Sequence, residues 1–168
     1  YTRTYTLSLH DALPIYGGEG NDEIKSESGN DILEGGKGND YLQGGYGSDT
    51  YIFSRGDGQD IIYDDGESSS VKDKITFKDI NREDVIFSRE NGSDISILIR
   101  GSKDKITIQY GHHERHRIEE IHFANGEVMT YEEMMKQTFE YYGDEQDNII
   151  NTYSTDDKID AGAGDDKI

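Results

Sequence analysis

A nine-residue repeat over residues 17–52 constrains this chain more than any other feature. Four consecutive blocks begin at residues 17, 26, 35 and 44. The sixth position of every block is an aspartate, and the eighth is large and apolar. These residues are Asp22, Asp31, Asp40 and Asp49 at position six, and Ile24, Leu33, Leu42 and Tyr51 at position eight. A short period kept in strict register predicts a repeat architecture.

Each block divides into a six-residue loop and a three-residue strand. Glycine at positions one, two and four lets the loop adopt positive φ, which a residue with a Cβ resists. The strand alternates between faces, so the side chain at position eight points inward. Two blocks make one coil of eighteen residues. This predicts that Asp22 lies beside Asp40, and Asp31 beside Asp49.

Stacked carboxylates repel one another unless a cation lies between them. A cage of carboxylates and backbone carbonyls suits a hard divalent ion, and calcium tolerates its irregular geometry better than magnesium does. The alternative interpretation is a flexible linker rich in Gly, Asn and Asp. The kept apolar position argues against a linker, because a linker has no core to fill.

These blocks resemble the RTX repeat of bacterial proteins exported by type I secretion, which forms a parallel β-roll with calcium between its turns. The resemblance implies that an ion takes carbonyls from positions two and four and the Asp of one loop. The loop two blocks later adds carbonyls from positions one and three and its own Asp. One implied site is Gly18, Gly20, Asp22, Gly35, Lys37 and Asp40, and the other is Glu27, Gly29, Asp31, Gly44, Tyr46 and Asp49. Ser26 and Glu27 replace glycines, so a strained loop and a weaker second site are expected.

The roll is expected to span residues 16–60. Asp60 follows Asp49 by eleven residues, so the period breaks there. The segment Arg55–Asp60 is predicted to be a closing loop, in which Asp57 or Asp60 completes a third site. The partners in that site are Gly36, Gly38 and Asp40. An ordinary polar turn is the alternative.

Residues 1–15 share nothing with the repeat, and LSLHDALPI within them resembles translated sequencing-adapter read-through. They are therefore expected to be a non-native leader outside the fold. A native strand leading into the roll is the alternative interpretation.

Residues 61–142 are predicted to form a mostly antiparallel β domain. Apolar residues alternate within it, for example at Ile106, Ile108 and Tyr110. Asn91-Gly92 and Asn125-Gly126 predict two hairpins. A helix is expected over about residues 131–141, starting with a capping box at Thr130 and Glu133. Its apolar residues are expected to pack on the sheet, with a partner groove as the alternative; they are Tyr131, Met134, Met135 and Phe139.

The segments DKITF, DISILI, KITIQY and IEEIHFANGE resemble the haemolysin-type calcium-binding-related domain that often follows RTX repeats. The resemblance covers about residues 44–135 and implies a structural role. From residue 143 the repeat resumes, with Asp147, Asp157 and Asp166 at the Asp position. Residues 143–168 are therefore expected to start a second β-roll, and the chain to be a fragment of a longer protein.

Composition limits the partners. The net charge is −19, from 36 acidic and 17 basic residues, so nucleic acid and anionic membranes would be repelled. Ile, Leu, Val and Phe are few for so large a charge, which predicts a fold that needs its cations. There is no cysteine, which excludes disulfides and thiolate sites. No apolar run approaches membrane-spanning length.

The sequence offers no catalytic motif. His113 and Glu114 are followed by His116 one residue too early for the zinc-protease pattern H-E-x-x-H. These histidines, with His112, are expected to lie in a solvated turn, adventitious zinc or nickel binding being the alternative. The chain also lacks a G-x-S-x-G nucleophile elbow.

The sequence thus predicts an all-β, non-catalytic, calcium-responsive module of a secreted RTX protein. Its partners would be calcium ions and, through the parent protein, the type I secretion machinery. It would act outside the cell or at the cell surface. Two alternatives stay open: a C-terminal carrier of an upstream protease, lipase or pore-former, and a spacer in a large surface adhesin.

Overall fold

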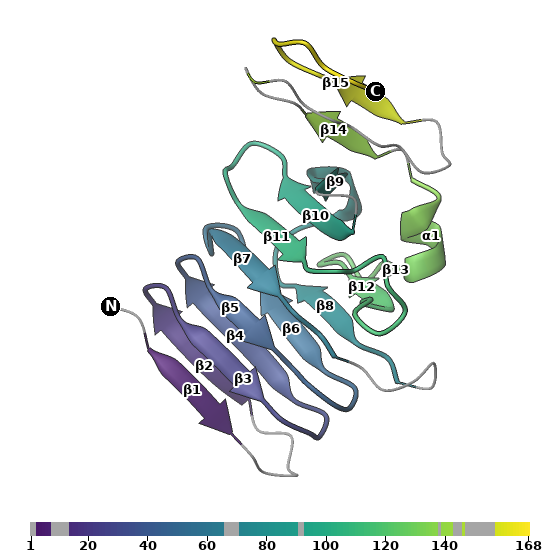
Figure 1. Cartoon of the computed structure of the whole chain (residues 1–168). Coiled ribbons are helices and arrows are strands. Elements are labelled where there is room, and N and C mark those ends of the chain that lie inside the picture. Colours follow the sequence, from purple (N-terminus) through teal and green to yellow (C-terminus); the bar gives the residue numbers. More distant parts are fainter. Residues whose placement is uncertain are drawn as a thin grey trace.

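Two layered sheets wind along the chain as a coil and continue into a β domain that contains both antiparallel and parallel strand pairs (Figure 1). The computed structural model describes residues 3–7, 14–65, 71–90, 93–137, 139–142, 146 and 157–168. In spatial order, the first sheet is β1 (Thr4–Leu7), β3 (Glu23–Ser26), β5 (Tyr41–Gln43), β7 (Gln59–Ile62), β11 (Lys105–Ile108), β10 (Asp94–Ile99) and β9 (Val85–Glu90). The second sheet is β13 (Val128–Thr130), β12 (Glu120–His122), β8 (Lys74–Phe77), β6 (Thr50–Phe53), β4 (Ile32–Lys37) and β2 (Pro14–Glu19).

The strand register confirms the eighteen-residue coil. Ile24 pairs with Leu42 across β3 and β5, and Leu33 pairs with Tyr51 across β4 and β6, all in parallel strands. The sequence spacing between paired residues is longer in the next turns, where Leu42 pairs with Ile62 and Tyr51 pairs with Ile75. The coil therefore absorbs insertions in its loops while keeping its apolar residues in register.

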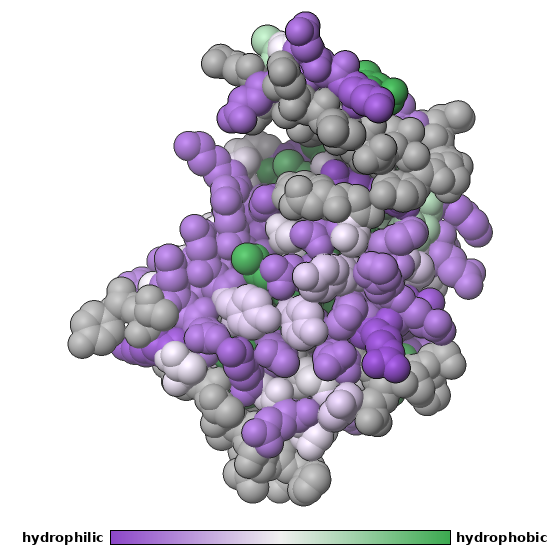
Figure 2. All heavy atoms as spheres, viewed as in Figure 1, coloured by the Kyte–Doolittle hydropathy of each residue, from purple (hydrophilic) through white to green (hydrophobic). Residues whose placement is uncertain are grey.

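The core lies between the two sheets. It consists of the position-eight side chains of the repeat and of the buried apolar side chains on the later strands. Ile24, Leu33 and Ile75 are 0% exposed. Burying an aliphatic side chain of this size contributes about 1.5–3 kcal/mol. On the face seen in Figure 2, most of the coloured residues are hydrophilic, and the apolar residues at position eight of the repeat are buried inside the coil.

Residues near the N-terminus take part in the coil, contrary to the expectation that residues 1–15 lie outside the fold. Strand β1 pairs in parallel with β3, and β2 pairs with β4. Ile15 is 5% exposed and lies nine residues before Ile24, so it fills the core position of a further rung. The apolar position, rather than the aspartate, defines this rung.

Both predicted hairpins are confirmed. Strands β9 and β10 pair antiparallel around residues 91–92, which lie outside the described residues. Strands β12 and β13 pair antiparallel around Asn125-Gly126, where Gly126 has a φ of 87°. Tyr110 departs from the predicted alternation: β11 ends at Ile108, and Tyr110 follows in a turn with a φ of 53° and 48% exposure.

Helix α1 (Tyr131–Met135) begins at the predicted capping box but is shorter than the predicted span. The Thr130 backbone N–H donates to Glu133 Oε2 at 2.8 Å, and the Glu133 N–H donates to Thr130 Oγ1 at 3.3 Å. The helix ends early because Phe139 is buried against Phe87, and the chain then enters β14 (Glu140–Tyr142). Tertiary packing overrides helix propensity there. Of the helices in the described part of the chain, none is long and apolar enough to cross a membrane.

Strands β14 and β15 (Lys158–Asp160) form a separate parallel pair, seen beyond β9 and β10 in Figure 1. Tyr141 pairs with Ile159, which is the same eighteen-residue spacing as in the roll. A short 3₁₀ turn (Arg82–Asp84) precedes β9.

Candidate metal centre

The repeat aspartates lie in two columns, one along each edge of the coil. In the first column, the Asp22 N–H donates to Asp40 Oδ1 at 2.7 Å, and the Asp40 N–H donates to Asp60 Oδ1 at 2.9 Å. Each aspartate therefore holds the backbone of the preceding loop on the same side. The predicted pairing of Asp22 with Asp40 is present.

The second column repeats the arrangement. The Asp31 N–H donates to Asp49 Oδ1 at 2.8 Å, and the Asp49 N–H donates to Asp73 Oδ1 at 2.7 Å. The predicted pairing of Asp31 with Asp49 is present, and Asp73 extends the column beyond the repeat. We call Asp22, Asp40 and Asp60 the first column and Asp31, Asp49 and Asp73 the second column.

One oxygen in most of these carboxylates has no donor. Among the residues that the structure describes, five such Oδ2 atoms are buried without a hydrogen-bond partner; they belong to Asp22, Asp31, Asp40, Asp49 and Asp60. The five residues are at most 5% exposed. A buried acceptor without a partner is costly, especially when charged. Calcium takes carboxylate and carbonyl oxygens as ligands, so these unpartnered carboxylate oxygens suit the ion.

Glycine at position one makes room for these oxygens. A Cβ on Gly35 would lie 2.3 Å from Asp40 Oδ2, and a Cβ on Gly44 would lie 2.3 Å from Asp49 Oδ2. The loop thus folds closely against the carboxylate of its own block. An alanine at either position would displace the aspartate that the repeat positions.

The second block tolerates its missing glycines. Ser26 is 4% exposed, and its hydroxyl donates to the Gly44 carbonyl at 2.6 Å. In the described part of the chain, Tyr110 is the only non-glycine residue with positive φ, so Ser26 and Glu27 are not strained in this way. The expected backbone strain is therefore absent. The hydroxyl instead engages a carbonyl that the resemblance assigns to the second site.

The carbonyls assigned to positions two and four face the next loop on the same side. A Cβ on Gly36 would lie 2.2 Å from the Gly18 oxygen, and one on Gly38 would lie 2.0 Å from the Gly20 oxygen. The same relation holds in the other loop column, where Cβ atoms on Gly45 and Gly47 would lie 2.5 Å and 1.8 Å from the oxygens of Glu27 and Gly29.

The position-three carbonyls already accept one hydrogen bond each. The Gly20 N–H donates to the Lys37 oxygen at 2.8 Å, and the Gly29 N–H donates to the Tyr46 oxygen at 2.8 Å. A carbonyl oxygen has two lone pairs, so each keeps one for a cation. The residues of both predicted sites are therefore adjacent across the loops.

Asp60, rather than Asp57, continues the first column. Asp57 is buried and its Oδ2 accepts the Ser54 N–H at 2.7 Å, which closes the turn. Gly38 bridges in parallel to Gly58, so the closing loop stacks on the repeat as predicted. Of the residues predicted for the third site, the structure therefore brings Asp40 and Asp60 together.

Burial governs the protonation of these carboxyls. It raises the pKa of Asp49 to about 6, of Asp73 to about 7 and of Asp60 to about 8. The pKa of Asp40 is raised for the same reason. Without a cation, burial favours the neutral form, and metal binding would have to release these protons.

Position five has a role that the repeat pattern did not reveal. The Oδ1 of Asn21 accepts the Asn39 N–H at 2.9 Å, and the Oδ1 of Asn30 accepts the Ser48 N–H at 2.8 Å. The recurrence of Asn at this position was the available signal. Asp73 was also missed, although Asp73 and Ile75 keep the spacing between positions six and eight.

The aspartates of the second array are not brought into a column by the described residues. Asp157 directly precedes β15, and Asp166 lies in the segment after it. Ile168 is 70% exposed. Asp147 lies outside the described residues.

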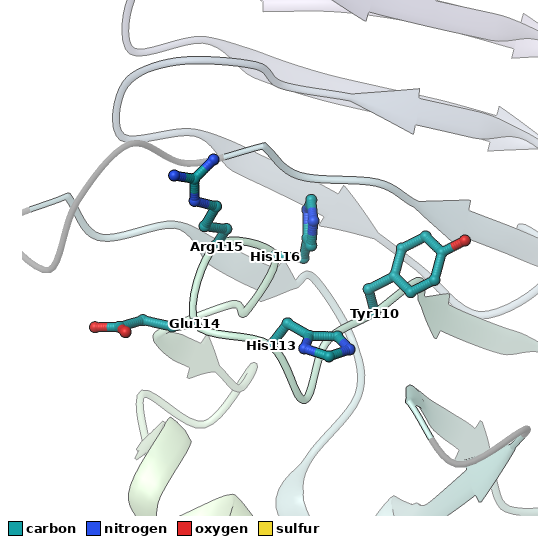
Figure 3. Close-up of a pocket in the computed structure, with 5 residues that line it drawn as sticks. All are labelled: Tyr110, His113, Glu114, Arg115 and His116. Carbon is teal, nitrogen blue, oxygen red and sulfur yellow. The ribbon is translucent and has the colours of Figure 1, made fainter.

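The histidine-rich segment forms a turn beside the sheet, as expected. Tyr110, His113, Glu114, Arg115 and His116 line a shallow pocket, and Figure 3 shows Glu114 directed away from Tyr110 and His113. In the described ranges, these histidines belong to no cluster of three metal-ligating side chains. Their geometry therefore does not favour a zinc site.

Comparisons with known proteins agree with the geometry. Residues 15–33, 26–60 and 141–168 match the RTX calcium-binding nonapeptide repeat, and residues 94–133 match the haemolysin-type calcium binding protein related domain. The chain is 37% identical over 124 residues to the iron-regulated protein FrpA of Neisseria meningitidis serogroup C. That similarity covers 69% of this chain and 11% of the relative, so the chain spans about a tenth of the relative's length.

Proposed function

The chain carries RTX calcium-binding nonapeptide repeats and a haemolysin-type calcium binding protein related domain, and from this premise we propose that it is a non-catalytic module that folds when calcium binds. The parent protein would be exported by type I secretion, and the module would act outside the cell or at its surface. Calcium would be held by the aspartates of the two columns and by the loop carbonyls beside them.

The five buried Oδ2 atoms without a donor are the observation that carries this proposal. Their spacing repeats with the coil, so a single kind of ligand would satisfy all of them. Protons could neutralise the carboxyls, but a divalent cation both coordinates oxygens from two loops at once and offsets two negative charges. Filling the columns would therefore link successive turns of the roll.

Charge explains why folding would depend on calcium. The chain carries a net charge of −19, and the columns stack carboxylates on carboxylates. Extracellular calcium modules bind with Kd values of roughly 10⁻⁴–10⁻³ M. At about 1 mM calcium and a Kd of about 10⁻⁴ M, each site adds about 1.4 kcal/mol. Several such sites together would reach the lower end of the stability of a small domain, which is about 5–15 kcal/mol.

Stability that depends on calcium concentration would also favour export. Inside the cell, where calcium is scarce, repulsion among the acidic residues would keep the chain extended enough to pass through a channel. Outside, ion binding would drive folding and oppose backward movement. The secretion machinery would then act on the parent protein, of which this chain is one segment.

The activity of the parent would lie outside this chain. The chain corresponds to 11% of its FrpA relative, so a catalytic or pore-forming segment elsewhere is compatible with the module's role as a carrier. A spacer in a large adhesin is the other candidate, favoured by repeat matches on both sides of the β domain. The full-length reading frame separates the two: an upstream H-E-x-x-H or G-x-S-x-G segment supports a carrier, and many alternating arrays support a spacer.

Far-UV circular dichroism of the 168-residue chain tests calcium-dependent folding. We expect little β signal in chelator, a cooperative gain as calcium rises to millimolar levels, and a much smaller gain with magnesium. Calorimetric titration should show several ions bound per chain. An identical, fully folded spectrum in chelator and in calcium would refute the proposal.

A further inference from the structure

The last rung of the second column differs from every rung before it. Successive aspartates are eighteen residues apart from Asp31 to Asp49, but Asp73 follows Asp49 by twenty-four. The inserted chain brings in Asp64, which follows β7 and belongs to no nonapeptide block. Carboxylate oxygens of Asp49, Asp64 and Asp73, one from each residue, lie within 4.8 Å of one another.

This cluster is sealed from solvent. Asp49 and Asp64 are 0% exposed, and Asp73 is 2% exposed. In the described part of the chain, Asp49 Oδ2 and Asp64 Oδ1 are buried without any hydrogen-bond partner. Three ionised carboxylates so close together in a dry interior would repel strongly, and buried charge requires compensation.

The other oxygens are fixed by neighbouring groups, which leaves the cluster preorganised. Asp49 Oδ1 accepts the Asp31 N–H, and Asp73 Oδ1 accepts the Asp49 N–H. Asp64 Oδ2 accepts the Tyr51 hydroxyl at 2.7 Å. These bonds hold each carboxylate by one oxygen.

Tyr51 marks the site in the sequence. The other three blocks have Ile or Leu at position eight, whereas the fourth has a tyrosine whose hydroxyl reaches Asp64 and accepts the Gly44 N–H at 2.9 Å. A Cβ on Gly44 would lie 2.5 Å from that hydroxyl and 2.3 Å from Asp49 Oδ2. The glycine therefore provides the space in which hydroxyl and carboxylate lie side by side.

We propose that Asp49, Asp64 and Asp73 form a divalent-cation site that extends beyond the nonapeptide pattern, at the junction of the roll with the β domain. The inference rests on the proposed calcium-binding function and adds a ligand, Asp64, that no repeat supplies. An all-oxygen site with three carboxylates suits calcium. Tyr51 is a positioning residue that orients Asp64.

The site connects segments that the repeat alone does not. Asp49 precedes β6, Asp64 follows β7, and Asp73 precedes β8. The Asp73 N–H donates to Glu119 Oε2 at 2.9 Å, and the Asp73 carbonyl accepts the Glu119 N–H at 3.0 Å, just before β12. An ion here would therefore order the first strand of the β domain together with the last rungs of the roll.

Calorimetric titration of the full chain with calcium chloride, comparing three variants with the unaltered protein, tests the proposal. Asp64→Asn should lose one bound ion per chain while the sites between the repeat loops remain. Tyr51→Phe keeps the core volume and should keep the number of ions but weaken one of them by about 10–100-fold, as loss of a ligand-orienting partner does. Asp22→Asn, at the far end of the first column, should remove binding there and leave the Asp64 site intact.

The outcomes separate this inference from the proposed function. If the unaltered chain binds no calcium, both fail. If it binds calcium and folded Asp64→Asn binds the same number of ions with the same affinities, only the site fails, and the three carboxyls share protons instead. If Asp64→Asn does not fold in calcium, Tyr51→Phe decides: a titration identical to that of the unaltered chain overturns the site.

Discussion

The central aspartate of a column should matter twice as much to calcium-linked stability as a terminal one. The Asp40 carboxylate accepts the Asp22 N–H, and the Asp40 N–H donates to the Asp60 carboxylate on the other side. Asp40 therefore borders two spaces between loops. Asp22 borders one such space between two aspartates, and on its other side its Oδ1 accepts the Arg3 N–H at 3.0 Å. Asparagine keeps an acceptor at Oδ1 but replaces the unpartnered Oδ2 with an amide, which cannot ligate a cation.

The expected magnitudes follow from ion binding. At calcium a hundred times Kd, Asp22→Asn should lose about 2.7 kcal/mol and Asp40→Asn about 5.4 kcal/mol of calcium-dependent stabilisation. For a chain of this size, where 1 kcal/mol shifts Tm by roughly 3 °C, the decreases in Tm are about 8 °C and about 16 °C.

Thermal unfolding followed by circular dichroism, at several calcium concentrations, measures both variants. The informative quantity is the slope of Tm against the logarithm of calcium, because it counts the ions taken up on folding. The slope should fall by one ion for Asp22→Asn and by two for Asp40→Asn. Equal decreases in the two variants would refute the idea that calcium ions are shared between successive aspartates of a column.

Three further results are expected. Burial raises the pKa of Asp60 to about 8 and of Asp73 to about 7 in the folded chain, above the usual 3.8, so the calcium-free fold should be most stable below about pH 4 and should weaken as pH rises toward 8. The loss is about 1.4 kcal/mol per pH unit for each carboxyl protonated only in the folded state, and circular dichroism in chelator at pH 5 and pH 8 measures it; greater structure at pH 8 would contradict it. Leu33→Ala, at a core position 0% exposed, should cost about 2–5 kcal/mol in urea unfolding at saturating calcium without changing the number of bound ions, and a cost below 1 kcal/mol would argue against the core. Ser26→Ala should cost about 1 kcal/mol in the same assay, since it removes the hydrogen bond to Gly44, and an unchanged midpoint would show that this bond contributes nothing.

The repeat allowed the coil and most of its candidate ligands to be predicted, because its two periodic positions have separate physical roles. Position eight fixed the core register, which the pairing of Ile24 with Leu42 confirms. Position six fixed the columns, as the hydrogen bond between Asp22 and Asp40 shows. A local pattern sufficed there because neighbouring turns of a coil have the same sequence spacing everywhere.

Prediction failed where contacts join segments without a shared period. Asp64 follows β7 and comes near Asp49 and Asp73, which precede the paired strands β6 and β8, and no spacing in the sequence encodes that approach. Helix α1 is a second example. The Thr130 cap predicted where the helix starts, but where it ends depends on the burial of Phe139, which is a tertiary contact. Ile15 was overlooked because its rung keeps the apolar residue and lacks the aspartate.

The sheets run without interruption from the roll into the β domain. Strand β7 pairs with β5 on one side and with β11 on the other, and β8 lies between β6 and β12. Each unit thus protects the other's edge strand. Cutting the chain between them would bare a row of unpaired backbone groups on both pieces, and such edges recruit foreign strands and promote aggregation. The junction is therefore a poor place to divide the protein, even though the sequence changes character there.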